Sequence, residues 1–247
     1  MLKFALTLVL VCLSIQAQAG SSLRFATSAN NPPFEYLNDR DLLVGFDIDL
    51  ANALCQRLKM ACLFTNNTFD RLLPSLKYHH DDAIISGMDI TDERMNDVDF
   101  TQPYLGNSSL MAVPKGRFWQ LAQLKGKRVG VRNLSTQQAY LRDRWPEIIA
   151  VTYDSYQNAL LDISKRRLDG ILGDTMVIRC MLKAHPQLVT VGGTLSDSRY
   201  FDNGMGIAVR KGDDDLRKAL NQALQSLTDD GTVRRLALHW FDPAHES

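Results

Sequence analysis

Short apolar segments alternate with amphipathic ones along most of this chain, and this alternation constrains the fold more than any other feature of the sequence. Residues 23–27 and 127–131 are predicted to be strands. Residues 47–58 and 216–227 instead carry apolar side chains at the spacing of one helix face, and Asp47 can cap the first of these helices. Strands that alternate with helices predict an α/β protein with parallel sheets.

The chain also repeats one helix–strand unit. Residues 69–87 align without a gap with residues 156–174, and each copy predicts a helix that leads into a buried strand. The similarity arises either from ordinary convergence of helix–strand pairs or from two similarly built lobes with a cleft between them. Ligands of parallel α/β sheets bind beyond the carboxyl ends of strands. The two-lobe interpretation therefore predicts a site built from residues 86–89 and Asp174.

Residues 86–94 offer several groups that could hold a small ligand. Ser86 supplies a hydroxyl, Gly87 a main-chain N–H, Asp89 a carboxylate and Arg94 a guanidinium. A planar guanidinium binds a carboxylate through two parallel hydrogen bonds, so Arg94 suits the α-carboxylate of an amino acid. The alternative is a surface arginine paired with one of its two acidic neighbours.

Three further positions carry both a binding and a plain structural interpretation. Ser135 and Thr136 follow a predicted strand at a helix start, where an anion is favoured, or else they simply cap that helix. Asp174 could hold an ammonium group or cap the helix that follows it. Phe69 could form a platform for an apolar or cationic group, or belong to the core.

Residues 1–19 have the organisation of a secretory signal peptide. Lys3 precedes an apolar run over residues 4–13, and residues 17–19 form an A-x-A cleavage site. The run is too short to span a bilayer, and no later segment approaches the ~20 apolar residues that a span needs. A retained anchor is the alternative, and Cys12 follows a valine, which argues against lipid attachment. We expect an exported chain that does not insert into the membrane.

Charge and cysteine content exclude several classes of protein. The chain has 28 basic and 28 acidic residues, and cleavage would remove only Lys3 from these. With no basic run, the sequence has no footprint for nucleic acid or anionic lipid. Export permits a disulfide, and the short separation of Cys55 and Cys62 suits one, whereas a metal site lacks histidines at ligand spacing. Cys180 remains unpaired, and we expect it to be buried.

Several stretches carry a resemblance to a known family. They are residues 32–35 (PPFE), 45–51 (GFDIDLA), 69–70 (FD), 74–77 (PSLK), 82–91 (DAIISGMDIT), 124–127 (LKGK) and 200–201 (YF). In this order they resemble the periplasmic binding proteins that serve ABC importers of polar amino acids, above all the arginine-binding and lysine/arginine/ornithine-binding members. The resemblance covers essentially the whole chain after residue 19.

The resemblance implies a bilobal α/β periplasmic-binding-protein fold, in which a two-strand hinge joins the lobes and the ligand cleft lies between them. The first lobe would comprise residues 20–106 and 208–247, and the second residues 107–207. Cys55 and Cys62 fall on a short disulfide of the family. Two lobes on a hinge can close around a ligand, which stabilises the closed form.

The resemblance also implies a role for each candidate residue. Arg94 would bind the α-carboxylate with help from Ser86 and Thr136, and Asp174 would receive the α-ammonium. Phe69 would pack on the ligand side chain. The predicted ligand-binding set is Asn31, Phe69, Ser86, Gly87, Asp89, Arg94, Arg132, Ser135, Thr136, Gln137 and Asp174.

Asp89 is the residue that favours arginine in this set. It stands where arginine-selective members carry an acid, and a carboxylate that faces the distal cation of the ligand would select for it. Gln137 would line the same end of the pocket.

Three positions depart from the family pattern. Asn31 replaces a tyrosine that sandwiches the ligand against Phe69. Arg132 occupies an apolar or acidic position, where a cation repels a guanidinium unless it points outward or pairs with an acid. Leu134 stands where a small residue is usual.

The function implied is capture of a cationic L-amino acid in the periplasm, arginine first, and its delivery to an ABC permease and ATPase without any cofactor. Lysine, ornithine, histidine and glutamine are alternative ligands. A cyclohexadienyl-dehydratase-like enzyme is a second class, but it needs an acid–base pair for which Asp89 has no evident partner. A sensor module is a third, and it would continue into a membrane span and a signalling domain.

Overall fold

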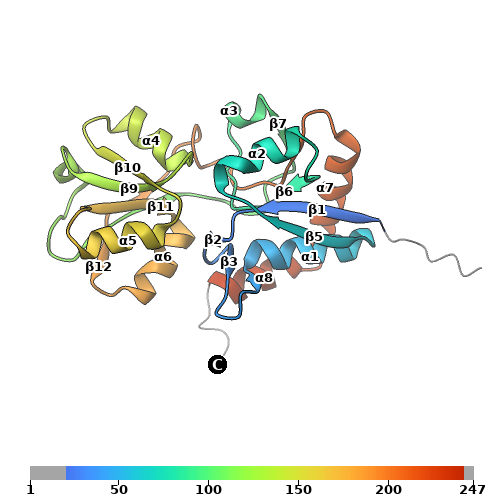
Figure 1. Ribbon diagram of the computed structural model, residues 1–247, viewed down its shortest axis with the longest axis horizontal. Coiled ribbons are helices and arrows are strands. Elements are labelled where there is room, and N and C mark those ends of the chain that lie inside the picture. Colours follow the sequence, from blue (N-terminus) through green and yellow to red (C-terminus); the bar gives the residue numbers. More distant parts are fainter. Residues whose placement is uncertain (1–20, 242–247) are drawn as a thin grey trace, which may run out of the picture.

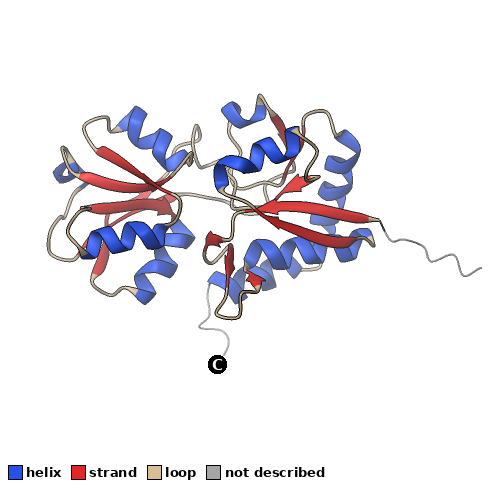
Figure 2. Cartoon of the chain, in the orientation of Figure 1, coloured by secondary structure: helices blue, strands red, loops and turns tan. Residues whose placement is uncertain are grey.

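The computed structural model describes residues 21–241, which form two α/β lobes side by side (Figure 1). The first lobe contains a sheet in the order β5-β1-β6-β13-β7, and the second a sheet in the order β10-β9-β11-β8-β12. Helices flank both sheets (Figure 2). The alternating pattern of the sequence therefore folds as two similar layered units.

The first lobe combines the N-terminal part of the chain with its C-terminal part. Its sheet consists of β1 (Ser22–Thr27), β5 (Ala61–Asn66), β6 (Ala83–Ile84), β7 (Val98–Phe100) and β13 (Ala208–Arg210). Its helices are α1 (Phe46–Leu58), α2 (Phe69–Lys77), α3 (Asp92–Met95), α7 (Asp214–Asp229) and α8 (Thr232–Phe241). A small sheet adds β2 (Asn30–Asn31), β3 (Glu35–Leu37) and β4 (Leu43–Val44). β1 pairs in parallel with β5 and β6, whereas β13 is antiparallel to β6 and β7.

The second lobe is continuous in sequence. Its strands are β8 (Ser109–Pro114), β9 (Arg128–Arg132), β10 (Ile149–Tyr153), β11 (Gly170–Asp174) and β12 (Leu188–Leu195). Its helices are α4 (Thr136–Arg144), α5 (Tyr156–Ser164) and α6 (Thr175–Ala184), with a 3-10 turn at Leu121–Leu124. β9 is parallel to β10 and β11, and β8 is antiparallel to β11 and β12.

The repeated unit of the sequence appears once in each lobe. Residues 69–87 form α2 and β6, and residues 156–174 form α5 and β11. Each copy places a helix on its sheet and ends its strand at the side that faces the other lobe. Convergence alone is therefore the weaker explanation of the similarity.

Two segments cross between the lobes. The chain leaves the first lobe after β7 and returns to it before β13. The crossing segments pair with each other: the Tyr104 N–H donates to the Met205 carbonyl at 2.9 Å, and the Met205 N–H donates to the Leu105 carbonyl at 2.8 Å. This bridge lies in the connection between the two lobes.

The core of each lobe consists of apolar side chains from its strands and helices. Fully buried examples are Phe25, Phe34, Phe46, Leu50 and Leu54 in the first lobe, and Val129, Val131, Ile171 and Leu172 in the second. Within residues 21–241, no helix is both long enough and apolar enough to cross a membrane. The predicted signal peptide, residues 1–19, lies outside the described residues.

The start of α1 differs from the sequence-based expectation. Asp47 does not cap this helix: the N-cap is Gly45, and the Asp47 carboxylate accepts the N–H of Gly87 at 2.6 Å. Gly45 has a φ of 134°, and a Cβ there would lie 2.1 Å from the Phe34 carbonyl oxygen. Only glycine fits this close approach, and the helix start is thereby set by the backbone rather than by a capping side chain.

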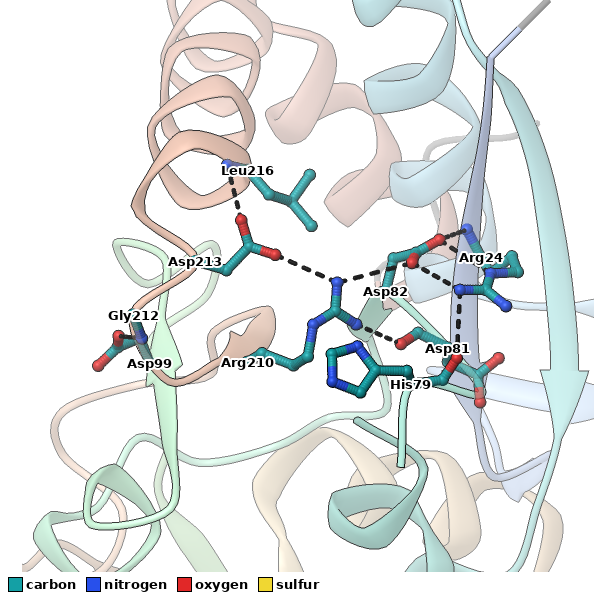
Figure 3. Close-up of polar contacts among 9 residues, drawn as sticks. All are labelled: Arg24, His79, Asp81, Asp82, Asp99, Arg210, Gly212, Asp213 and Leu216. Carbon is teal, nitrogen blue, oxygen red and sulfur yellow. Dashed lines mark hydrogen bonds and ion pairs between the residues drawn. The ribbon is translucent and has the colours of Figure 1, made fainter. Parts of the chain in front are cut away.

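A disulfide and an ionic network tie elements of the first lobe together. The predicted bridge is present: Cys55 at the end of α1 joins Cys62 in β5. Cys180 is a free thiol as expected, but it is half-buried rather than buried. Figure 3 shows Asp82 between two arginines, with Arg24 Nη2 at 2.8 Å and Arg210 Nη2 at 3.8 Å from its Oδ1. These contacts connect β1, the loop before β6 and β13.

Candidate functional site between the lobes

Two buried carboxylates meet where the lobes face each other. Asp89 follows β6 of the first lobe, and Asp174 ends β11 of the second. Asn107, in a crossing segment, donates from Nδ2 to Oδ1 of both acids at 2.6 Å. Thr136 donates to Asp89 Oδ2 at 2.5 Å, and Gln137 Nε2 donates to Asp174 Oδ1 at 2.8 Å. The two copies of the repeated unit therefore contribute to one site.

The environment of these acids favours the approach of a cation. Burial raises the pKa of Asp89 to about 8, and the charge of Asp174 adds to the shift. Burial also raises the pKa of Asp174, against the hydrogen bonds from Asn107 and Gln137 that lower it. An ammonium group placed between the two carboxylates would relieve both effects, because it supplies the missing positive charge.

Arg94 lies beside the carboxylate pair on the short helix α3. Its own N–H donates to the Thr91 hydroxyl at 3.2 Å, which caps this helix. Its guanidinium donates to the main-chain carbonyl of Asp89 at 2.8 Å and to that of Leu134 in the other lobe at 3.3 Å. A groove of about 490 Å³ opens next to Arg94. Arg94 therefore spans the cleft edge rather than forming a surface pair with its acidic neighbours.

Arg132, at the end of β9, points into the cleft. Its Cζ lies 4.4 Å from the centre of the Phe69 ring, at the start of α2 in the other lobe. Its Nη2 donates to Asn30 Oδ1 at 3.0 Å, and its Nη1 lies 3.8 Å from Glu35 Oε1. Only 6 % of the residue is exposed. The sequence left two possibilities for Arg132, an outward orientation or a pair with an acid. The structure shows the pair with an acid.

A second pair of buried acids, Glu35 and Asp47, lies in the first lobe beside Ser86 and Gly87. The Ser86 hydroxyl donates to Glu35 Oε1 at 2.8 Å, and the Gly87 N–H and the Tyr104 hydroxyl both donate to Asp47. Burial raises the pKa of Asp47 to about 7 and that of Glu35 well above its ordinary value. Ser86 and Gly87, expected to face a ligand, therefore have these groups engaged within the first lobe.

The start of α4 supports the simpler of the two interpretations of Ser135. Its hydroxyl accepts the N–H of Gln138 at 3.2 Å, which makes Ser135 the N-cap. Thr136 is the residue that reaches across to Asp89. Asp174 is the N-cap residue of α6 by position, but its side chain makes no capping hydrogen bond and is directed to Asn107 and Gln137.

Asp89 and Gln137 lie in the same cluster as Asp174. The resemblance implied that Asp89 faces the distal cation of the ligand; in the structure it shares Asn107 with Asp174, the acid predicted to receive the ammonium group. Gln137 donates to Asp174 in this cluster. The acid that forms an ion pair with Arg132 is Glu35, which no strand-end pattern singles out although it belongs to the PPFE stretch.

Asn107 and Asn30 are the other site residues that sequence analysis missed. Asn107 lies in a crossing segment and follows no predicted strand, so only the three-dimensional hinge brings it to the acids. Asn30 binds Arg132 and also donates from Nδ2 to the Asp154 carbonyl at 2.9 Å. Among residues 21–241, no group of three or more histidine, cysteine, aspartate or glutamate side chains is arranged to hold a metal ion.

Direct contacts hold the lobes together over this site. Asn30 with Asp154, Arg94 with Leu134, Arg132 with Glu35 and Thr136 with Asp89 each join one lobe to the other. The carboxylates are only 4 % and 8 % exposed at Asp89 and Asp174. The site is thus an enclosed, charged interface with two guanidinium groups, two facing carboxylates and an aromatic ring.

Known proteins with similar sequences bind amino acids. Residues 23–243 match the bacterial extracellular solute-binding proteins, family 3. The putative ABC transporter arginine-binding protein 2 of Escherichia coli K12 is 45 % identical over 98 % of this chain and 99 % of its own length. The histidine-binding periplasmic protein of Salmonella typhimurium is 36 % identical over 98 % of both chains.

Solved structures agree with this similarity. A Salmonella typhimurium periplasmic binding protein studied for its high arginine specificity superimposes with a TM-score of 0.86 and 41 % identity, over 90 % of this chain and 99 % of that one. An ancestral arginine-binding protein bound to arginine gives a TM-score of 0.83 and 34 % identity, over 90 % and 98 % of the two chains. The sequence match, the bilobal fold and the enclosed site concur, and the chain belongs to the bacterial extracellular solute-binding proteins of family 3.

Proposed function

We propose that this protein captures a free L-α-amino acid between its lobes and delivers it to an ABC importer. The observation that carries the proposal is the position of Arg94 beside the Asp89–Asp174 pair. A guanidinium next to two carboxylates matches the opposite charges of an amino-acid backbone. Arg94 binds the α-carboxylate, and the two acids receive the α-ammonium in place of the Asn107 amide or beside it.

Arginine is the first ligand to test. Phe69 offers a ring on which a guanidinium can stack, and Glu35 supplies a carboxylate on the same side of the cleft. The relatives named for arginine support this choice, and the histidine-binding relative makes histidine the next candidate. Lysine, ornithine and glutamine complete the set.

The protein acts after export. Residues 1–19 are cleaved near Ala19, the remaining chain resides in the periplasm, and an inner-membrane permease with its ATPase receives the ligand. Residues 20–106 with 208–247 and residues 107–207 move as two bodies about the Tyr104–Met205 bridge. A ligand that contacts both lobes stabilises the closed form. The importer recognises the ligand-bound protein by this closed form.

A thermal-shift screen against the twenty amino acids, ornithine and citrulline tests the proposal directly. A ligand that binds only the folded protein raises its stability by about 2.7 kcal/mol at a hundredfold excess over the dissociation constant. We expect the largest shift with arginine, followed by titration calorimetry to obtain the affinity. A screen in which no amino acid shifts the transition would show that the proposed function is wrong.

A further inference from the structure

Arg132 stands where a bound cationic side chain would stand. Its guanidinium lies 4.4 Å from the centre of the Phe69 ring and 3.8 Å from Glu35, and it reaches both from the opposite lobe. An aromatic face and a buried carboxylate are the two partners that a ligand guanidinium needs. Arg132 of the protein itself therefore contacts Phe69 and Glu35, the groups that a ligand guanidinium would bind.

The Arg132 guanidinium already lies over the face of the Phe69 ring. The cavity beside it, lined by Asn30, Thr68, Phe69, Asp70, Arg132, Asn133 and Asp154, measures about 10 Å³. Such a volume accommodates about one water molecule. A ligand side chain can therefore reach the ring face that Arg132 covers only if Arg132 moves.

The contacts of Arg132 are incomplete, which allows it to move. The distance of 3.8 Å to Glu35 exceeds a hydrogen bond. Among the described residues, Nε of Arg132, Oε2 of Glu35 and both amide atoms of Asn31 are buried without a hydrogen-bond partner. Buried polar groups without partners cost free energy, so a ligand that satisfies them can replace the Arg132 guanidinium.

We propose that Arg132 is a tethered competitor for the side-chain end of the ligand site. This inference rests on the proposed function. A cationic amino acid binds Phe69 and Glu35 only after it displaces Arg132, whereas an amino acid with a short side chain uses Arg94, Asp89 and Asp174 alone. Arg132 consequently lowers the affinity for arginine relative to that for small neutral amino acids, and it is a specificity-determining residue.

The expected size of the effect follows from how often Arg132 covers the ring. The apparent affinity of a ligand falls in proportion to the fraction of molecules that can bind it. If Arg132 covers Phe69 in nine molecules of ten, its removal strengthens arginine binding by about tenfold. The affinity for alanine, whose side chain does not reach the ring, changes by less than about twofold in the same variants.

Titration calorimetry of the exported protein with arginine and with alanine tests this inference. The variants are Arg132→Leu and Arg132→Gln, of which the second keeps an N–H donor beside the buried Glu35 and thus protects the fold. Arg179→Leu removes an exposed arginine from α6 of the same lobe and serves as the matched control. We expect tighter arginine binding in both Arg132 variants, unchanged alanine binding, and no change in the control.

Two results would overturn the inference and leave the proposed function standing. In the first, the wild-type protein binds arginine, and both Arg132 variants bind it equally or more weakly, which would make Arg132 inert or a direct ligand contact. In the second, the wild-type protein binds an acidic amino acid and the variants lose it, which would make Arg132 a partner of the ligand carboxylate. Absence of any amino-acid binding in all proteins would overturn the proposed function and this inference together.

Discussion

Thr136 donates its hydroxyl hydrogen to the Asp89 carboxylate over 2.5 Å, from the first turn of α4 in one lobe to the segment after β6 in the other. Both residues are nearly buried. The bond joins the lobes at the same place where Asn107 bridges the two acids. Asp89 therefore takes part both in a contact between the lobes and in the cluster of acids proposed to bind the ligand.

Removal of this bond tests its part in lobe closure. Thr136→Val keeps the shape of the side chain and deletes the hydroxyl, and a buried group left without its hydrogen-bond partner costs about 1–3 kcal/mol. We expect amino-acid affinity to fall by about tenfold or more, because the closed form loses a contact between the lobes. Titration calorimetry measures the change, and Thr152→Val, at an exposed position of β10, is the control. Equal affinities for both variants would show that the bond has no part in closure.

Arg94 is expected to be required for every α-amino acid. Arg94→Ala removes the guanidinium proposed to bind the α-carboxylate, and loss of one partner of a buried charge pair costs about 2–5 kcal/mol, or roughly 30-fold to several thousand-fold in affinity. The loss should be similar for arginine, histidine and glutamine, because all share the carboxylate. Arg71→Ala, an exposed change on α2, is the control. A loss confined to one ligand would instead place Arg94 at the side-chain end of the site.

Ligand binding is expected to release protons from the Asp89–Asp174 pair. The pKa of Asp89 is raised from 3.8 to about 8 by burial and by the charge of Asp174, so the pair holds a proton near neutral pH. A ligand ammonium lowers this pKa, and the proton leaves. Because binding releases a proton, the affinity for the ligand falls as the pH falls from about 8 towards 6. The fall is up to about tenfold per pH unit for one proton.

The release is measured by calorimetry in two buffers that differ in their heat of ionisation. The wild-type protein should show a buffer-dependent heat at pH 7. Asp89→Asn cannot hold the proton, so its heat should depend less on the buffer. A wild-type heat that is independent of the buffer would mean that the pair is already ionised before the ligand arrives.

The disulfide is expected to stabilise the first lobe without affecting ligand recognition. Cys55 and Cys62 are separated by seven positions and tie α1 to β5, away from the residues of the site. Closure of a loop of this length stabilises the folded state by about 2.5 kcal/mol, through loss of entropy in the unfolded chain. Replacement of both cysteines by alanine should lower the free energy of unfolding by this amount in urea titrations. Arginine affinity measured well below the transition should not change.

The secondary structure was largely predictable because its signals are local. The apolar spacing over residues 47–58 and 216–227 predicted α1 and α7, and the repeated unit predicted α2 with β6 and α5 with β11. Asp47 was the local error. Its carboxylate could have capped α1. It instead accepts a hydrogen bond from the buried N–H of Gly87, forty residues away in the sequence.

The candidate site was predictable in part. Strand ends marked Asp89 and Asp174, and the resemblance marked Arg94, Phe69 and Thr136. Asn107 and Asn30 escaped detection because each acts only where segments distant in the sequence meet. No spacing in the sequence encodes such a meeting.

The sequence by itself determined the α/β class, the two related units, the disulfide pair and the family. The tertiary structure decided that Asp89 shares Asn107 with Asp174 and that Arg132 points inward onto Phe69. The physical reason is the range of the interactions. Helix and strand periodicity depends on neighbours a few positions apart, whereas the direction of a buried charge depends on the partners that the folded lobes bring to it, because a charge is buried only where other groups compensate it.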